Sequence, residues 1–229
     1  MSREMSDEQA IESSHRCPLD PGTRGAGRPR ACDAEARTQE LINSAGELFL
    51  EKGYAKVSLE MIARRARVAV RTIYVKFGGK SGLFREVLLS GRNAYFATME
   101  DLGTNRRPIR EVLIDFGVRI HDMLSSPTAI QLYRMVIAEA HRDPELAEAF
   151  YEAGPRQTRD ALSRYFTRPD VRSQFRADIP PEQLTIHLIN CLMGDHLKRY
   201  LFNPQAGGER EDALLVEQRV DLFLRGAQS

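Results

Sequence analysis

The chain has 229 residues, 42% of them hydrophobic, and a formal net charge of +1. This length and hydrophobic content are enough for one large or two small domains with hydrophobic cores. No apolar run reaches the ~20 residues that span a bilayer, and the charged N-terminus lacks the apolar segment of a secretory signal. We therefore expect a soluble, cytoplasmic protein with no membrane partner.

Residues 1–32 are predicted to form a disordered arm, because they contain several glycines and prolines and few large apolar groups. The arm ends in the basic stretch RGAGRPR, residues 24–30. Residues 24–80 hold twelve Lys and Arg against six Asp and Glu, a net +6 that a polyanion partner would favour. Arg28 and Arg30 are candidates for entering a DNA minor groove. The alternative is a solubilising tail that contacts nothing specific.

Residues 33–80 are predicted to form a bundle of three short helices. The first runs from about Asp33 to a stop at Gly53. Ser58 is a candidate N-cap for the second helix, whose apolar stripe is Leu59, Ile62, Ala63 and Ala66. The stripe breaks at Arg67 and Val68 and resumes with Ile73, Tyr74 and Phe77. Two short helices joined by a tight turn are typical of a helix-turn-helix.

The outer face of the second helix of this pair favours DNA binding. Arg71, Thr72 and Lys76, with Lys80 beyond the next turn, lie at positions that the apolar stripe leaves free. Basic and hydroxyl side chains are the types that bind phosphate oxygens and base edges. A solvated face of an ordinary helical bundle would have a similar pattern, so this evidence alone leaves both interpretations open.

This stretch resembles the DNA-binding module of the TetR family of bacterial regulators. Residues 49–54, FLEKGY, are similar to the F-x-x-x-G-[YF] that ends the family's first helix. Residues 72–83, TIYVKFGGKSGL, are similar to its T-[LI]-Y-x-x-F-x-x-K-x-x-L block. With the resemblance, the predicted DNA-binding residues are Arg28, Arg30, Ser58, Arg67, Ala69, Val70, Arg71, Thr72, Tyr74, Lys76 and Lys80.

Two residues depart from the family's pattern. Arg67 occupies a turn position where the family usually has glycine, and a positive φ there would cost a non-glycine residue roughly 1 kcal/mol. Ala69 stands where a Ser or Thr cap usually precedes the recognition helix, and an alanine cap typically forgoes ~1 kcal/mol. Both raise the possibility of a vestigial head, although Arg67 is also a candidate for contact with DNA.

Residues 81–229 are predicted to form a helical ligand-binding and dimerisation domain. A long helix from about Lys80 to Leu102 would leave the small bundle, with Lys80 and the helix N-terminus offering a phosphate site. Further helices are expected at 109–124, 127–141, from Asp143 to an interruption at Gly154-Pro155, and at 157–166, 181–202 and 210–225. The predicted fold class is all-α. Residues 132–155 are similar to the C-terminal domain of the AefR-like TetR subgroup.

The last two predicted helices carry more apolar surface than one core needs, which indicates a homodimer interface. The resemblance implies the same, because the family dimerises through its last two helices. The alternative is a buried hairpin within one chain. The predicted interface residues are Leu184, Leu188, Leu192, Val216, Val220 and Phe223.

The same domain is expected to hold a cavity for a small apolar or amphipathic ligand, because it combines bulky, adaptable side chains with a few polar ones. The alternative for each of them is ordinary core packing, because any helical core uses such residues. The candidates are Phe96, Met99, Phe116, Ile120, His121, Met123, Tyr133 and Phe150.

No active-site motif was found: there is no G-x-S-x-G, P-loop or H-E-x-x-H, and the three cysteines lack C-x-x-C spacing. We therefore predict no enzyme activity, no cofactor and no metal site. The sequence favours a ligand-responsive transcriptional regulator, most simply a repressor that binds a pseudo-palindromic operator as a homodimer. The alternative is a helical small-molecule or protein-binding module with a vestigial DNA-binding head.

Overall fold

The computed structural model describes residues 31–99, 101–203 and 213–229. This part of the chain is helical apart from turns and one isolated bridge between Phe175 and Gln228, which confirms the predicted all-α class. Arg28 and Arg30 lie outside the described residues. No helix in these ranges is both long and apolar enough to cross a bilayer.

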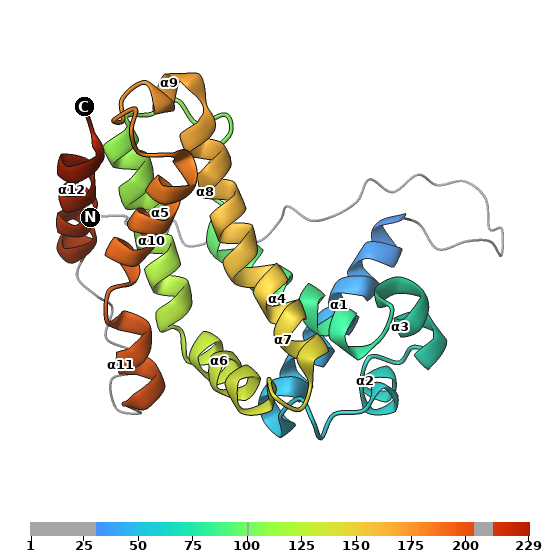
Figure 1. Ribbon diagram of the computed structural model, residues 1–229. Helices are drawn as coiled ribbons and strands as arrows, with labels where there is room; N and C mark the ends of the chain where they lie inside the picture. The colour runs from blue at the N-terminus through green and yellow to red at the C-terminus, as the bar shows by residue number, and fades with distance from the viewer. Residues whose placement is uncertain (1–30, 100, 204–212) are drawn as a thin grey trace, which may run out of the picture.

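Three helices form a small head at the lower right of Figure 1: α1 (Ala31–Lys52), α2 (Leu59–Arg65) and α3 (Val70–Phe77). The apolar stripe of α1 is buried against the other two, as its spacing predicts. Helix α4 (Lys80–Phe96) then runs out of the head toward the rest of the molecule. It ends six residues before the predicted Leu102, and Asp101 closes a turn there by accepting a hydrogen bond from the Gly103 N–H at 2.7 Å.

The remaining helices form the body. They are α5 (Ile109–Ser125), α6 (Pro127–Glu139), α7 (Pro144–Tyr151), η1 (Glu152–Arg156), α8 (Gln157–Thr167), α9 (Pro169–Arg172), α10 (Pro181–Met193), α11 (His196–Phe202) and α12 (Ala213–Ala227). Ser126 and Asp143 cap α6 and α7 with side-chain hydrogen bonds, and each of these helices begins with proline.

Two predicted boundaries of the body were wrong. The expected interruption at Gly154-Pro155 is instead the π-helical turn η1, which joins α7 to α8 and contains Pro155, a residue with no backbone N–H to donate. The single helix expected at 181–202 is divided into α10 and α11, because Gly194 adopts a φ of 44° that ends α10.

The molecule contains two hydrophobic cores. The larger joins α5, α8, α9, α10 and α12 in the body. The smaller joins α1, α2, α3 and the start of α4, and it also takes in Val136 of α6 with Leu146 and Ala149 of α7. The apolar core of the head thus extends past residue 80 into the body.

Candidate functional site

Helix α1 holds the two short helices of the head in place. Arg65, in the last turn of α2, donates to both carboxylate oxygens of Glu51 at 2.9 and 3.0 Å and to Glu47 Oε2 at 2.7 Å. Ile62 and Ile73 are fully buried and fix the inner faces of α2 and α3 in the core. The pair is therefore a rigid unit seated on α1.

The turn between α2 and α3 contains strained backbone. Arg67 has a φ of 53° and is the one non-glycine residue with positive φ in the described chain. Its side chain is exposed. Ser58 caps α2 by accepting a hydrogen bond from Met61 N, as predicted, whereas Ala69 starts α3 with no side-chain cap. Both expected costs at this turn, the strained Arg67 and the missing cap, are present in the structure.

The outer face of α3 is open to solvent. Arg71 and Lys76 are exposed, Tyr74 is 57% exposed, and Thr72 and Val70 are half-buried. Val75, 75% exposed, lies on the same face and was missed by the sequence analysis. Its signal was its absence from the apolar stripe, and an exposed apolar group on a recognition helix is suited to contact a thymine methyl group.

Two of the predicted cations have partners within the protein. Lys76 Nζ donates to Thr38 Oγ1, so a hydrogen bond holds the ammonium group of this exposed side chain against α1. The Lys80 ammonium lies 4.1 Å from the centre of the Tyr54 ring, and burial lowers the pKa of Lys80, against the opposing effect of Asp143 and Glu139. Lys80 thus stands at the first turn of α4, half-buried at the base of the head.

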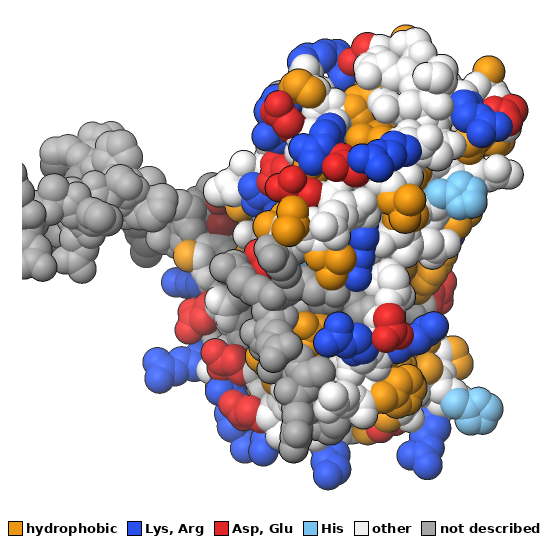
Figure 2. Space-filling view, turned by 90° about the vertical axis from the view of Figure 1, so that its left-hand side faces the viewer, with side chains coloured by type: hydrophobic (Ala, Val, Ile, Leu, Met, Phe, Trp, Pro, Cys, Tyr) orange, Lys and Arg blue, Asp and Glu red, His pale blue; other side chains and the backbone are white. Residues whose placement is uncertain are grey.

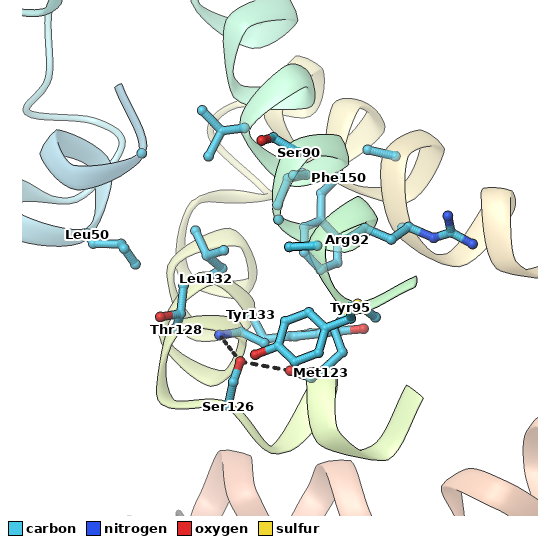
Figure 3. A pocket seen from close by; sticks show the side chains of 18 of the residues that line it. Leu50, Ser90, Arg92, Tyr95, Met123, Ser126, Thr128, Leu132, Tyr133 and Phe150 are labelled. Carbon is cyan, nitrogen blue, oxygen red and sulfur yellow. Dashed lines mark hydrogen bonds between the residues drawn. The ribbon is translucent and has the colours of Figure 1, made fainter. Parts of the chain in front are cut away.

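A cavity of about 560 Å³ lies between the head and the body, shown in Figure 3. Its walls come from α1, α4, the end of α5, α6, the end of α7 and η1. Leu50 of α1 lines it on one side, and Tyr133 and Phe150, whose rings meet edge to face at 4.8 Å, line another. The volume is in the range of pockets that enclose small organic molecules. Burial raises the pKa of Tyr133, so its phenol stays a neutral donor or acceptor.

The predicted ligand residues are divided between this cavity and the body core. Met123, Tyr133 and Phe150 line the cavity. The other apolar candidates do not line it: Phe116 and Ile120 of α5 belong to the body core, and Phe96 and Met99 pack against that core. His121 is also buried away from the cavity, with its Nε2 2.7 Å from the Leu192 carbonyl oxygen. The wall formed by α1 was not predicted from the sequence.

The predicted dimer residues lie in the core of the protomer, not on its surface. Leu184, Leu188, Leu192, Val216, Val220 and Phe223 are each at most 4% exposed and pack with α5 and α8. Their assignment as interface residues was wrong, because the regular stripe marks the inner face of each helix. Ile186 of α10 and Leu214 and Leu222 of α12 remain exposed. Figure 2 shows the molecule from the side on which α12 lies in Figure 1, and the hydrophobic side chains on this surface are interspersed with Lys, Arg, Asp and Glu.

In the described part of the chain, no three His, Cys, Asp or Glu side chains are grouped so as to hold a metal ion. The Cys191 thiol is free and half-buried, and burial raises its pKa. A raised pKa disfavours the thiolate that nucleophilic or redox chemistry requires. The candidate functional surfaces are the exposed outer face of the α2–α3 pair and the cavity.

Two known protein families match the chain, one in the head and one in the body. A model described as bacterial regulatory proteins of the TetR family matches residues 41–87. A second model, described as the C-terminal domain of AefR-like transcriptional repressors, matches residues 111–226. The first range covers the second half of α1, all of the α2–α3 pair and the first half of α4. The second runs from the first turn of α5 to the last turn of α12.

Individual proteins give the same picture. The chain is 25% identical over 175 residues to the transcriptional repressor ComR of Escherichia coli K12, covering 74% of this chain and 80% of that one. A crystal structure of a TetR-family regulator from Mesorhizobium loti superposes with a TM-score of 0.66 at 26% identity, covering 86% and 98% of the two chains. NalD, described as a secondary repressor of a multidrug efflux pump in Pseudomonas aeruginosa, gives a TM-score of 0.59 at 25% identity, covering 86% and 98%.

Proposed function

Because the chain belongs to the TetR family of bacterial transcriptional regulators, we propose that it is a repressor that binds a pseudo-palindromic operator as a homodimer and is released by a small molecule. The observation that carries this proposal is the open outer face of α3 on a firmly braced head. Arg71, Thr72 and Val75 face the major groove, while Tyr74 and Lys76 contact the phosphate backbone beside them.

The homodimer follows from the size of the recognition surface. One recognition helix makes a handful of base contacts, whereas two helices related by a two-fold axis read two half-sites roughly 34 to 36 Å apart, or more. The exposed Ile186, Leu214 and Leu222 on α10 and α12 are the apolar groups that would meet a second copy. Relatives named as repressors support repression in preference to activation.

The cavity between head and body is the proposed site of the effector, a small apolar or amphipathic molecule. DNA binds well to one arrangement of the two heads, and the effector favours another. Each ligand therefore lowers the affinity of the other by the same factor, which corresponds to a coupling free energy of typically ~1 to 3 kcal/mol. The alternative function is a helical small-molecule or protein-binding module with a vestigial DNA-binding head. The strained Arg67 and the uncapped Ala69 favour this alternative, whereas the intact contacts that hold α2 and α3 argue against it.

Selection of bound duplexes from a random DNA pool, at ~150 mM salt to suppress phosphate-only binding, tests the proposal. Recovery of a pseudo-palindrome is the expected result, with sedimentation showing two chains per duplex. Recovery of no common sequence by a folded protein would favour the vestigial head. A single half-site bound by one chain would contradict the homodimer.

Replacing Arg67 by glycine is expected to separate stability from DNA binding. Glycine adopts the φ of 53° without strain, so the free energy of unfolding rises by up to about 1 kcal/mol. Affinity for the selected duplex falls, because a guanidinium beside the recognition helix is lost. Urea unfolding and fluorescence anisotropy measure the two effects. Arg67→Ala is the control, since it removes the charge and keeps the strain. Unchanged affinity in both variants would contradict DNA contact by Arg67.

Replacing Lys80 by alanine is expected to weaken binding to selected and random duplexes alike. If the ammonium reaches a phosphate, the slope of log affinity against log salt falls by about one unit. A titration with salt from ~50 to 300 mM measures this slope. The competing explanation is that Lys80 only packs on Tyr54. In that case stability would fall and the slope would remain that of the native protein.

A further inference from the structure

One wall of the cavity belongs to the DNA-binding head itself. The α1 residues that line the cavity are Ile42, Asn43, Gly46, Glu47 and Leu50. With 3.6 residues per turn they share one face of the helix. The other face carries Leu41, Ala45 and Leu48, which pack into the core of the head. Helix α1 therefore separates the cavity from α2 and α3 by the thickness of one helix.

The same helix holds the recognition pair by polar contacts. Glu47 lines the cavity and also accepts from Arg65 of α2 at 2.7 Å. Thr38, about two and a half turns earlier, accepts a hydrogen bond from Lys76 Nζ of α3. A shift or rotation of α1 is therefore passed to α2 and α3 through these contacts, independently of the link that α3 makes with α4.

On its cavity side, α1 is attached to the body by few polar contacts. Gln39 donates to Ser90 of α4 at 2.9 Å, and Gln131 of α6 donates to the Leu50 carbonyl oxygen at 2.7 Å. Between these two attachments lies the cavity. Val87 of α4 and Leu132 of α6 face α1 across the cavity walls. A molecule larger than the space between them pushes α1 away from α4 and α6.

We propose that the effector acts on the DNA-binding helices directly through α1, with the cavity-lining face of α1 as the sensor. This inference rests on the proposed function for the existence of an effector, but it concerns the route of coupling. In the alternative route the effector displaces α4 alone, and α1 moves only because the whole head moves as one rigid body.

A side chain that fills the cavity replaces the unidentified effector in the test. Gly154 in η1 and Gly91 in α4 both line the cavity, and a Cβ atom at either position meets no atom within 4 Å. Gly154→Phe and Gly91→Phe introduce an aromatic ring from two different walls. Gly154→Ala and Gly91→Ala are matched controls that leave the volume almost unfilled.

Two measurements are made on each full-length variant. Affinity for the selected duplex is expected to fall by about 5- to 150-fold in the Phe variants, the usual range of allosteric coupling, and to stay unchanged in the Ala variants. Amide hydrogen exchange is expected to increase in residues 38–52 of α1 and in α2, while the body core of α5, α10 and α12 keeps its protection.

Faster exchange confined to α4, with α1 unchanged and affinity reduced, would overturn the α1 route and leave the proposed function intact. Native affinity and native exchange in both Phe variants would also overturn it. If the native protein selects no duplex, the proposed function fails. The exchange of α1 then still decides whether the cavity acts on this helix.

Discussion

Replacing Gly82 by alanine is expected to disrupt the head more than any other single-methyl change in α4. A Cβ atom at this position would lie 1.8 Å from the Phe77 carbonyl oxygen, far inside van der Waals contact. The obstructing atom is backbone, so no side-chain rotation relieves the overlap and the α3–α4 junction must open. We expect a loss at or above the upper end of the ~1–3 kcal/mol that overpacking costs, and loss of DNA binding with it. Equilibrium urea unfolding and anisotropy measure the two effects.

Gly91→Ala is the matched control for this substitution. Gly91 lies in the same helix, and a Cβ atom there meets nothing within 4 Å. Because alanine favours helix over glycine by roughly 0.5–1 kcal/mol, this variant should be as stable as the native protein or more so. If Gly82→Ala were as stable as Gly91→Ala, the close approach of α3 and α4 would not be a feature of the folded protein.

Arg71→Ala is expected to reduce affinity for the selected duplex by about 5- to 150-fold, which corresponds to the ~1–3 kcal/mol of one base-reading contact. Arg71 is exposed on the outer face of α3 and makes no hydrogen bond or ion pair with any part of the chain that the structure describes. Its removal should therefore leave the free energy of unfolding unchanged. Affinity for random duplexes should fall far less.

Arg64→Ala provides the comparison for Arg71→Ala. Arg64 is an exposed arginine in the last turn of α2, so its loss changes the net charge of the head equally. We expect a small loss that is the same on selected and random DNA. An equal loss on both duplexes for Arg71→Ala would show that Arg71 contacts phosphate and would refute base reading. Repeating the duplex selection with Arg71→Ala identifies the base pair, because specificity should relax at that position.

The head was predictable from the sequence because its signals are local. The cap at Ser58, the apolar spacing around Ile62 and Ile73, and the strained turn at Arg67 each depend on residues a few positions apart. The match of the 41–87 region to the TetR family confirms the helix-turn-helix assignment. The contacts of Lys76 with Thr38 and of Lys80 with Tyr54 were not predicted, because they join residues 38 and 26 positions apart.

The cavity and the dimer surface were much less predictable, for one physical reason. Helical periodicity shows which residues face inward, but it does not show which neighbour they face. Phe116 and Tyr133 are both inward, yet Phe116 fills the body core and Tyr133 lines the cavity. In the same way the most regular apolar stripes of α10 and α12 mark the protomer's own core. The residues that remain for a partner, such as Leu222, interrupt the polar face and form no pattern.

The shared core of the head limits how these regulators can be recombined. Val136, Leu146 and Ala149 belong to the body in sequence but to the head in packing, together with Phe49, Tyr54 and Phe84. A hybrid that joins this head to the body of a relative, with the exchange point at residue 80, would set foreign α6 and α7 side chains into that core. Transplanting the DNA specificity of this protein would therefore require the α6–α7 segment to be transferred together with the head.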